Sequence, residues 1–379
     1  MSFKESIQNL SILGSGQVIV ILLSVIFYFG FAYLLGPEKY GNTIYLISIA
    51  TIIPTFSRFG LSLSVITFVA KKEIELEKSA NLLAFVVALI TSLILVLIDP
   101  FIALLAFSFS IFQMQIGNYF GQKKYKIVSM SQVGRSVIWI VIAISLYFVM
   151  EIPGILLGMA IGNFAFSYNY LKSLKLKEWS FNKLKSKFKI ILQNFGVDVQ
   201  QIIPNQIDKL VIVPLFGFQI TGIFHFAIQF LIAIELLTLV LHRFLLAEQS
   251  SEKISKRFIY LASLTSVVII LAGIYLAPII IENLFSEYES SISAVQMIVF
   301  GVIPLICIAI LNAKLQVLES NLVGYGVIVR IGANLVLIPI LGGLMGIIGL
   351  VIANLVSLVL LTIFLLILYS RIKRPENLH

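Results

Sequence analysis

Apolar stretches recur along this chain from end to end, separated by short polar connections. Each stretch holds 18 or more residues with almost no charge, enough to cross a hydrocarbon core of about 30 Å as a helix. We therefore predict about twelve membrane-spanning helices. Their expected ranges are 11–35, 41–69 with a bend near Pro54, 79–98, 100–120, 126–149, 152–171, 190–216, 220–244, 258–281, 292–313, 320–342 and 345–370.

Composition agrees with this pattern and excludes an ordinary soluble enzyme. Of the 379 residues, 59% are hydrophobic and 12% are charged, whereas soluble domains carry about a quarter charged residues. The first apolar stretch is too long for a signal-peptide core and is predicted to be a permanent span. The single cysteine, Cys307, lies in an apolar stretch, so we expect neither a disulfide framework nor a cysteine metal site.

The net charge of +9 is explained by topology. Connections after even-numbered spans hold nearly all the basic residues, whereas the opposite connections contain Lys39 as their only basic residue. The positive-inside rule then places both termini in the cytoplasm of a multi-pass protein of the cell membrane. We expect no nucleic-acid partner.

The longest polar connection, 172–189, contains seven lysines and one glutamate. Leu174, Phe181, Leu184 and Phe188 recur in it at helical spacing, so it is predicted to be a basic amphipathic linker that contacts anionic lipids at the cytoplasmic face. Two interpretations stay open. The segment is either a positively charged linker between two halves or a collecting surface for an anionic lipid-linked substrate.

Two short motifs recur in the same order in the two halves of the chain. LLGPEKYG at 34–41 matches LFGFQITG at 215–222 with an offset of 181 residues, and GMAIGN at 158–163 matches GLVIAN at 349–354 with an offset of 191. The matches indicate a duplicated unit of six spans, and an even number gives both copies the same orientation.

We therefore expect an all-α polytopic membrane protein with two pseudo-symmetric six-helix lobes, 1–171 and 190–379. Lobes of this kind can rock about their interface and expose a central cavity to each side of the membrane in turn. Transport by alternating access is thus the leading hypothesis from the sequence.

Arg58, Arg135 and Arg330 lie well inside the predicted spans, where an ionisable side chain usually faces a cavity or a partner. Arg135 and Arg330 occupy the fifth span of each lobe, and the offset of 191 brings them within four residues, or about one helical turn. Guanidinium groups bind phosphate bidentately, so with Arg58 these residues would suit an anionic, phosphate-bearing substrate. The alternative is that each arginine snorkels to the inner interface or pairs within its own lobe.

Other ionisable residues in the spans are candidates for ion coupling or gating. Asp208 and Lys209 are adjacent, about 100° apart on a helix, so the alternative to a coupling role for Asp208 is a structural pair between lobes. Glu235 could carry a proton or be hydrogen-bonded within its lobe. His225 is expected at the interface near the outer end of its span. Pro204 interrupts the helical hydrogen bonds and would let the seventh span bend.

Parts of both halves resemble a known family. Gln17, the turn at 34–41 and SRFGL at 57–61 resemble the opening of oligosaccharide flippases, in the polysaccharide-transport branch of the multidrug/oligosaccharidyl-lipid/polysaccharide exporter superfamily. Residues 205–230 resemble the family's seventh and eighth spans. The resemblance implies two six-helix bundles that move a polyprenyl-(pyro)phosphate-linked oligosaccharide from the inner to the outer leaflet, for polysaccharide or glycoconjugate synthesis.

The resemblance also implies where the substrate binds, since the family's cationic cavity falls here on Arg58 and Lys209. The complete set of expected substrate-binding residues is Arg58, Arg135, Arg330, Lys209 and Gln17. Asp208 and Glu235 are the coupling or gating candidates. The expected partners are the lipid-linked anionic glycan, anionic lipids and glycan-assembly enzymes, with no cofactor, no metal and no catalytic residue.

Two other functions stay open at this point. A cation-coupled multidrug exporter of the same superfamily would favour acidic cavity walls, whereas basic residues outnumber acidic ones in the predicted spans. A membrane glycan polymerase or ligase would need acid or base groups on the outer side. The outer connections are too short to supply them, so we do not expect an enzyme.

Overall fold

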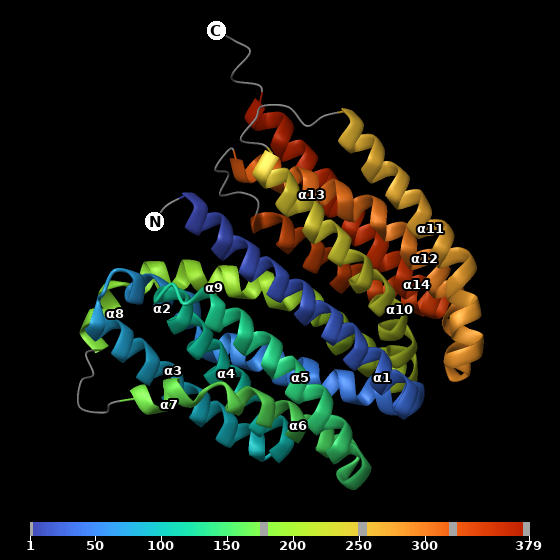
Figure 1. The fold of residues 1–379 in the computed structure, drawn as a ribbon. Helices are drawn as coiled ribbons and strands as arrows, with labels where there is room; N and C mark the ends of the chain where they lie inside the picture. The colour runs from blue at the N-terminus through green and yellow to red at the C-terminus, as the bar shows by residue number, and fades with distance from the viewer. Residues whose placement is uncertain (1–2, 175–180, 249–255, 318–323, 374–379) are drawn as a thin grey trace. The chain divides into compact units, whose positions relative to one another are not determined.

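The computed structural model describes residues 3–174, 181–248, 256–317 and 324–373, which are helical over nearly their whole length (Figure 1). The helices are Phe3–Arg58 (α1), Leu61–Ala70 (α2), Ile74–Val96 (α3), Pro100–Gly121 (α4), Tyr125–Met150 (α5), Ile152–Ala165 (α6), Tyr168–Ser173 (α7), Phe181–Ser186 (α8), Phe188–Ile202 (α9), Ile207–Glu248 (α10), Lys256–Leu284 (α11), Ile292–Ile298 (α12), Val302–Val317 (α13) and Tyr325–Lys373 (α14).

Within these ranges, eight helical segments are long and apolar enough to cross a membrane. Three of the longest helices are each divided into two arms by a glycine with a positive φ, namely Gly36 in α1, Gly217 in α10 and Gly346 in α14. Counting the arms separately, and adding the shorter apolar helix α6, accounts for the expected set of about twelve spans. The all-α polytopic fold is therefore confirmed.

The expected bend near Pro54 is wrong, and the expected break at Pro204 is correct. Helix α1 continues through Pro54 to Arg58, and the chain turns at Phe59 and Gly60, whose φ values are 47° and 75°. A proline is tolerated inside a membrane helix when neighbouring groups satisfy the carbonyl that it frees. At Pro204, by contrast, α9 ends and a 3₁₀ turn over Ile203–Asn205 leads into α10.

By packing, the chain divides into two compact units. Unit 1 comprises Met1–Phe27 and Leu46–Gln206, and unit 2 comprises Tyr28–Tyr45 and Ile207–His379. The middle of α1 therefore packs in unit 2, and α9 packs in unit 1. These units are defined by contacts, whereas the expected lobes, 1–171 and 190–379, are defined by duplication and stay a prediction. The linker between those lobes, 172–189, includes residues 175–180, which lie outside the described residues.

Helix α4 lies at the centre of unit 1, with most of its length buried. Asp99 caps its first turn, since the carboxylate accepts hydrogen bonds from Phe101 N and Ile102 N, both at 2.8 Å. Asn118 on α4 and Asn81 on α3 exchange two side-chain hydrogen bonds at 3.0 and 3.1 Å. Helices α5 and α6 form an antiparallel pair (Figure 1).

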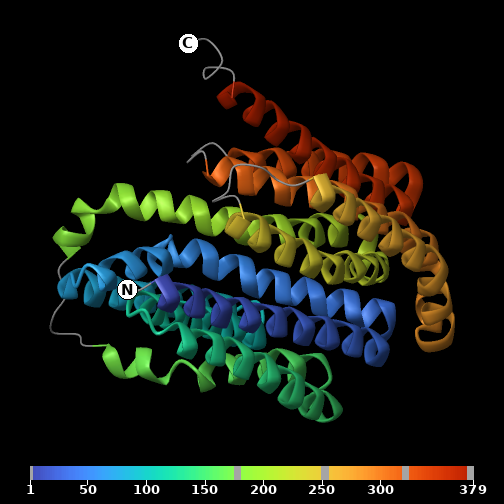
Figure 2. The same cartoon turned by 45° about the horizontal axis from the view of Figure 1, so that its top comes forward.

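Helix α9 is fixed against the turn that follows α1. A side chain at Gly60 would overlap the backbone of Ile191 and Phe195 on α9, and the Phe59 and Phe195 rings stack with centroids 4.5 Å apart. The lime-green α9 accordingly runs beside α2 (Figure 2). This contact joins segments more than a hundred residues apart in the sequence and positions the charged residues of α9.

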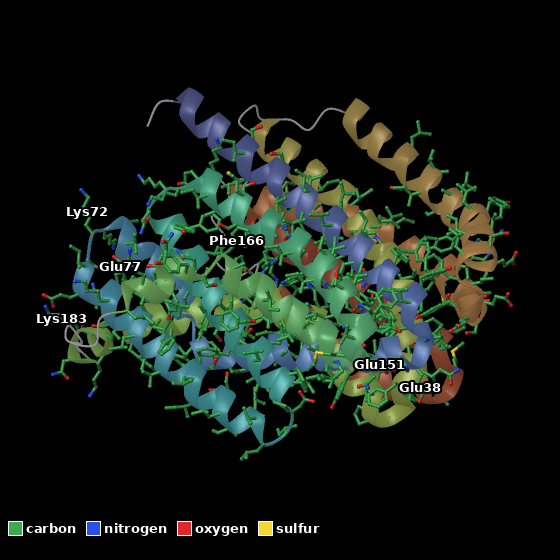
Figure 3. All side chains as sticks on the ribbon, turned by 60° about the horizontal axis from the view of Figure 1, so that its bottom comes forward. Glu38, Lys72, Glu77, Glu151, Phe166 and Lys183 are labelled. Atoms are coloured by element: carbon green, nitrogen blue, oxygen red, sulfur yellow. The ribbon has the colours of Figure 1, made fainter. Side chains whose placement is uncertain are left out.

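The two ends of unit 1 carry different loops, as the alternation of basic and acidic connections predicted. Figure 3 shows Lys72, Glu77 and Lys183 at one end of unit 1 and Glu151 at the other. By the positive-inside rule the lysine end would be cytoplasmic, which stays a prediction.

The first repeated motif has the same conformation in both copies. Gly36 (φ 66°, ψ 171°) and Gly217 (φ 82°, ψ 176°) make equivalent turns at the predicted offset of 181. Within unit 2 the two motifs contact each other reciprocally. A side chain on Gly41 would overlap the Phe218 carbonyl, and one on Gly222 would overlap the Pro37 carbonyl, so the second glycine of each motif lets the backbones cross.

The second repeat is present, but its predicted offset of 191 is wrong. Glu151 (φ 53°, ψ −132°) and Gly346 (φ 59°, ψ −135°) make matching turns, which gives an offset of 195. The glycine three residues after each turn then packs against an equivalent carbonyl, Gly154 on Leu146 and Gly349 on Leu341. Residue similarity alone misplaced the register because several glycines lie close together in both segments.

The corrected register changes the relation between two candidate arginines. At an offset of 195, Arg330 on α14 corresponds directly to Arg135 on α5, rather than to a position one turn away. The duplicated unit thus carries an arginine at the same position of both copies.

Candidate functional site

A polar cavity of about 360 Å³ lies within unit 1, between helices that are far apart in the sequence. Residues from α1, α2, α4, α5 and α9 contribute to its walls. The lining residues are Arg58, Ser62, Leu63, Ile66, Gln113, Ile116, Gly117, Phe120, Gln132, Asp198, Gln201 and Ile202. Two opposite charges and three glutamine side chains in one cavity of a membrane helix bundle make it the strongest candidate site in this unit.

Arg58 is the buried cation of this cavity. It ends α1 and is only 3% exposed. Its Nε has no hydrogen-bond partner among the described residues. A buried guanidinium N–H without an acceptor is costly, so Arg58 has a donor available for an oxygen of a bound molecule.

Asp198 is the buried anion of the same cavity. Its carboxylate, 6% exposed, accepts a hydrogen bond from Ser62 Oγ at 3.0 Å and lies close enough to Arg58 for their charges to interact. Close packing of α4 on α2, where a side chain at Gly117 would overlap the Ser62 carbonyl, positions Ser62 for this bond.

Of the residues that line this cavity, the sequence analysis selected Arg58 alone as a binding residue, and it did not group Arg58 with Asp198 or Gln113. Ser62, Gln132 and Gln201 were not selected. The available signal was Ser62 directly after SRFGL, together with Asp198 as one of the few acids within a span. Their proximity depends on α9 packing against α2, which no local pattern reveals.

Arg135 is held by aromatic rings. Its guanidinium carbon lies 4.4 Å from the ring centroids of both Phe112 and Trp139, an arrangement that stabilises a cation away from water. Arg135 is not among the described residues that line the Arg58 cavity, although Gln132, one turn earlier on α5, is. Gln17, also in unit 1, is half-buried on the first arm of α1.

In unit 2, Asp208 and Lys209 pair with each other. Lys209 Nζ lies 3.1 Å from Asp208 Oδ1, and both side chains are about 95% buried. The Lys209 backbone N–H also donates to Asp208 Oδ1 at 2.9 Å. Asp208 thus has a cation beside it on its own helix, and the structural pair between lobes, one of the two roles considered for Asp208, stays a prediction. A buried ion pair leaves a strongly unfavourable charge when one partner is removed.

The other candidates of unit 2 lie elsewhere along its helices. Arg330 is half-buried on the first arm of α14, and its Nε has no hydrogen-bond partner within the described ranges. Glu235 lies on α10, but its side chain is outside the described residues. Arg330 belongs to unit 2 and Arg58 and Arg135 to unit 1, so a cavity shared by all three stays a prediction.

His225 is not the interfacial residue that the sequence suggested. It is 4% exposed, with its Nε2 2.7 Å from Gln229 Nε2 and its ring beside those of Tyr28 and Tyr40. The expectation failed because the region around the Gly36 turn folds over this part of α10 and removes it from the surface. The hydroxyl of Tyr40 and Nδ1 of His225 have no hydrogen-bond partner in the described part of the chain.

Comparison with known proteins identifies the fold. No protein-family model matches this sequence, and no curated protein sequence matches it. Among solved structures, the chain is similar to an inward-facing multidrug resistance MATE family transporter of the MOP superfamily, with a TM-score of 0.66 and 15% identity over 94% of this chain and 96% of the other.

Two further solved structures resemble it over most of their length. One is the lipid II flippase MurJ in an inward closed conformation, with a TM-score of 0.68 and 15% identity over 96% of this chain and 87% of that one. The other is a MOP superfamily transporter from Pyrococcus furiosus, with a TM-score of 0.59 and 14% identity over 96% of each chain. The chain thus has the multi-pass helical fold of these transporters.

Proposed function

We propose that this protein is a transporter that flips a polyprenyl-(pyro)phosphate-linked oligosaccharide from the inner to the outer leaflet. The observation that carries the proposal is the buried Arg58, whose Nε has no acceptor among the described residues and which lines a polar cavity of about 360 Å³. A guanidinium group is suited to phosphate because its N–H groups match phosphate oxygens and it stays charged when desolvated.

The rest of the cavity suits the other parts of such a substrate. Gln113, Gln132 and Gln201 offer amide donors and acceptors that can bond to sugar hydroxyls or phosphate oxygens. Arg135, Arg330, Lys209 and Gln17 remain candidates for contacts along the transport path. The equivalence of Arg135 and Arg330 in the corrected register favours a related role in both halves.

The fold supports transport, and the sequence resemblance supports the substrate class. The solved structures of this fold include both a lipid II flippase and multidrug transporters, so the fold alone does not select a substrate. Duplicated halves suit alternating access. An enzymatic role would need a catalytic group in addition to binding groups, and we propose none.

A second candidate function is a cation-coupled multidrug exporter. Asp198 favours it, since this buried carboxylate lines the same cavity as Arg58 and could attract an organic cation. Phe120 in the same wall would add a ring for cation–π contact.

Depletion of the protein from its own cells separates the two functions. Mass spectrometry of extracted lipids should then reveal lipid-linked sugars that accumulate at the inner leaflet, while sensitivity to cationic drugs stays unchanged. Cells that accumulate no lipid-linked sugar but become drug-sensitive would instead identify an exporter.

We also propose that Asp208 takes part in ion coupling, and a single charge-removing substitution tests this role. In proteoliposomes, the Asp208→Asn protein should still move substrate down the substrate's own concentration gradient. An imposed ion gradient should no longer change the rate of that movement. The same change should lower stability by about 3–5 kcal/mol, because it removes the carboxylate beside the buried Lys209.

The double variant Asp208→Asn/Lys209→Gln separates coupling from folding. It removes both charges, so thermal denaturation should return toward that of the unchanged protein. If gradient dependence also returns, Asp208 has only a structural role. If it stays absent in a stable protein, the coupling role stands.

A further inference from the structure

A second cavity, an apolar groove, lies in unit 1, away from the Arg58 site. Its volume is about 730 Å³, within the range of about 300–1,000 Å³ common for sites that bind small molecules. It is formed by the end of α1 and by α2, α3, α8 and α9. Its walls include Phe56, Phe59, Leu83, Val87 and Phe188, and Lys185 is its only charged lining residue.

One side of this groove is packed and the other is open. Its packed side is formed by Leu61, Leu184 and Ile191, whose side chains are 3–5% exposed and belong to the hydrophobic core of unit 1. Phe56 and Phe188, in contrast, are 51% and 53% exposed. An exposed apolar surface of this kind indicates a binding site for a partner or for lipid, and in a multi-pass membrane protein the surrounding medium is hydrocarbon.

The lysines of this region differ in their ion pairing. Lys183 pairs with Glu75, and Lys187 Nζ lies 3.7 Å from Glu73 Oε1. These two pairs tie the α8–α9 region to the start of α3. Lys185, between them, is exposed at the groove and forms no ion pair with any residue that the structure describes.

We propose that this groove binds an acyl chain of an anionic phospholipid, with the lipid phosphate against Lys185. An apolar groove that ends at an ammonium group with no ion pair among the described residues matches a ligand with a hydrocarbon chain and an anionic head. The groove lies at the lysine-rich end of unit 1, which is the predicted cytoplasmic side, where anionic lipids concentrate. The inference does not depend on the transported substrate, because anionic phospholipids are components of the cytoplasmic leaflet whatever the protein transports.

The charged head, not the chain, should decide selectivity. In a membrane the acyl chain moves from one apolar environment to another, so its transfer favours the groove mainly through shape. The attraction of one lysine to an anionic lipid corresponds to about a fivefold preference. We therefore expect phosphatidylglycerol to occupy the groove about fivefold more than phosphatidylcholine.

Photocrosslinking in nanodiscs tests this proposal with the full chain. Phosphatidylglycerol carrying a photoreactive acyl chain should label residues of the groove, mapped by peptide mass spectrometry. Lys185→Gln should reduce this labelling about fivefold and leave phosphatidylcholine labelling unchanged. The matched control is Lys189→Gln, at an exposed lysine that does not line the groove. Phosphatidylglycerol should label this variant to the same extent as the unchanged protein.

A second variant tests the chain-binding part separately. Val87→Trp fills the groove without changing a charge and should reduce labelling by both lipids, with the melting temperature as a check on folding. Equal labelling by the two lipids in the unchanged protein would overturn the assignment, and so would labelling that neither variant alters. Displacement of phosphatidylglycerol by a small molar fraction of polyprenyl phosphate would instead assign the groove to the chain of a transported lipid.

Discussion

Replacing Arg58 by glutamine is expected to reduce translocation of a lipid-linked oligosaccharide by about 10- to 150-fold. The reason is that hydrogen bonds to a charged group contribute about 1.5–3 kcal/mol, and the buried Arg58 side chain has an Nε donor with no acceptor among the described residues. Translocation should be measured in proteoliposomes, as the fraction of labelled substrate that becomes accessible from outside. Arg58→Lys should be intermediate, since it keeps the charge but loses the planar fork.

Arg58→Gln also leaves Asp198 as a buried carboxylate without its cation, so folding must be controlled. The double variant Arg58→Gln/Asp198→Asn removes both charges and should be stable yet translocate as slowly as Arg58→Gln, whereas Asp198→Asn alone should stay active on an anionic substrate. Lys72→Gln, at an exposed lysine outside the cavity, should translocate normally. Translocation by the stable double variant at the unchanged rate would remove Arg58 from the proposed mechanism.

Adding a methyl group at Gly41 or at Gly222, the second glycine of each copy of the first repeated motif, should destabilise the protein by about 1–3 kcal/mol. In Gly41→Ala the new carbon would overlap the Phe218 carbonyl, and in Gly222→Ala it would overlap the Pro37 carbonyl. These neighbours are backbone atoms, which cannot rotate away, so the helices must move apart. Because the two contacts are equivalent, the two variants should lower the midpoint of thermal denaturation by similar amounts.

Gly30→Ala, in the same helix as Gly41, is the matched control. Nothing lies within 4 Å of the position that its new carbon would take, so the change should be neutral or stabilising by up to about 1 kcal/mol. If Gly41→Ala and Gly30→Ala melt at the same temperature, the close crossing at the motif does not contribute to stability. Unequal effects of Gly41→Ala and Gly222→Ala would show that the two copies have diverged in their packing.

The spans and the duplication could be predicted from the sequence because both depend on local rules. A membrane helix needs only a long apolar stretch, and the turn glycines Gly36 and Gly217 mark equivalent places in the two copies. The register of the second repeat could not be read in this way, since backbone dihedral angles at Glu151 and Gly346, not residue similarity, determine it. The bend expected at Pro54 failed for a related reason, because neighbouring helices decide whether a proline breaks a membrane helix.

The candidate site was predicted only in part. Arg58 could be selected because a charge within an apolar span is costly and therefore informative. Its grouping with Asp198 required α9 to pack on α2 through Gly60, a contact between distant segments. The burial of His225 likewise depends on packing that hydropathy does not describe.

By itself, the sequence determined that this is a multi-pass helical membrane protein with a duplicated plan and a few costly charges in its spans. Hydrogen bonding in lipid permits few alternatives for such a composition. Only the tertiary structure decided where the charges lie: Arg58 beside Asp198 in one polar cavity, and Lys185 at an apolar groove, with no ion pair to any described residue. Those encounters depend on close contacts between helices, which single glycines such as Gly60 and Gly117 allow and which apolar periodicity cannot specify.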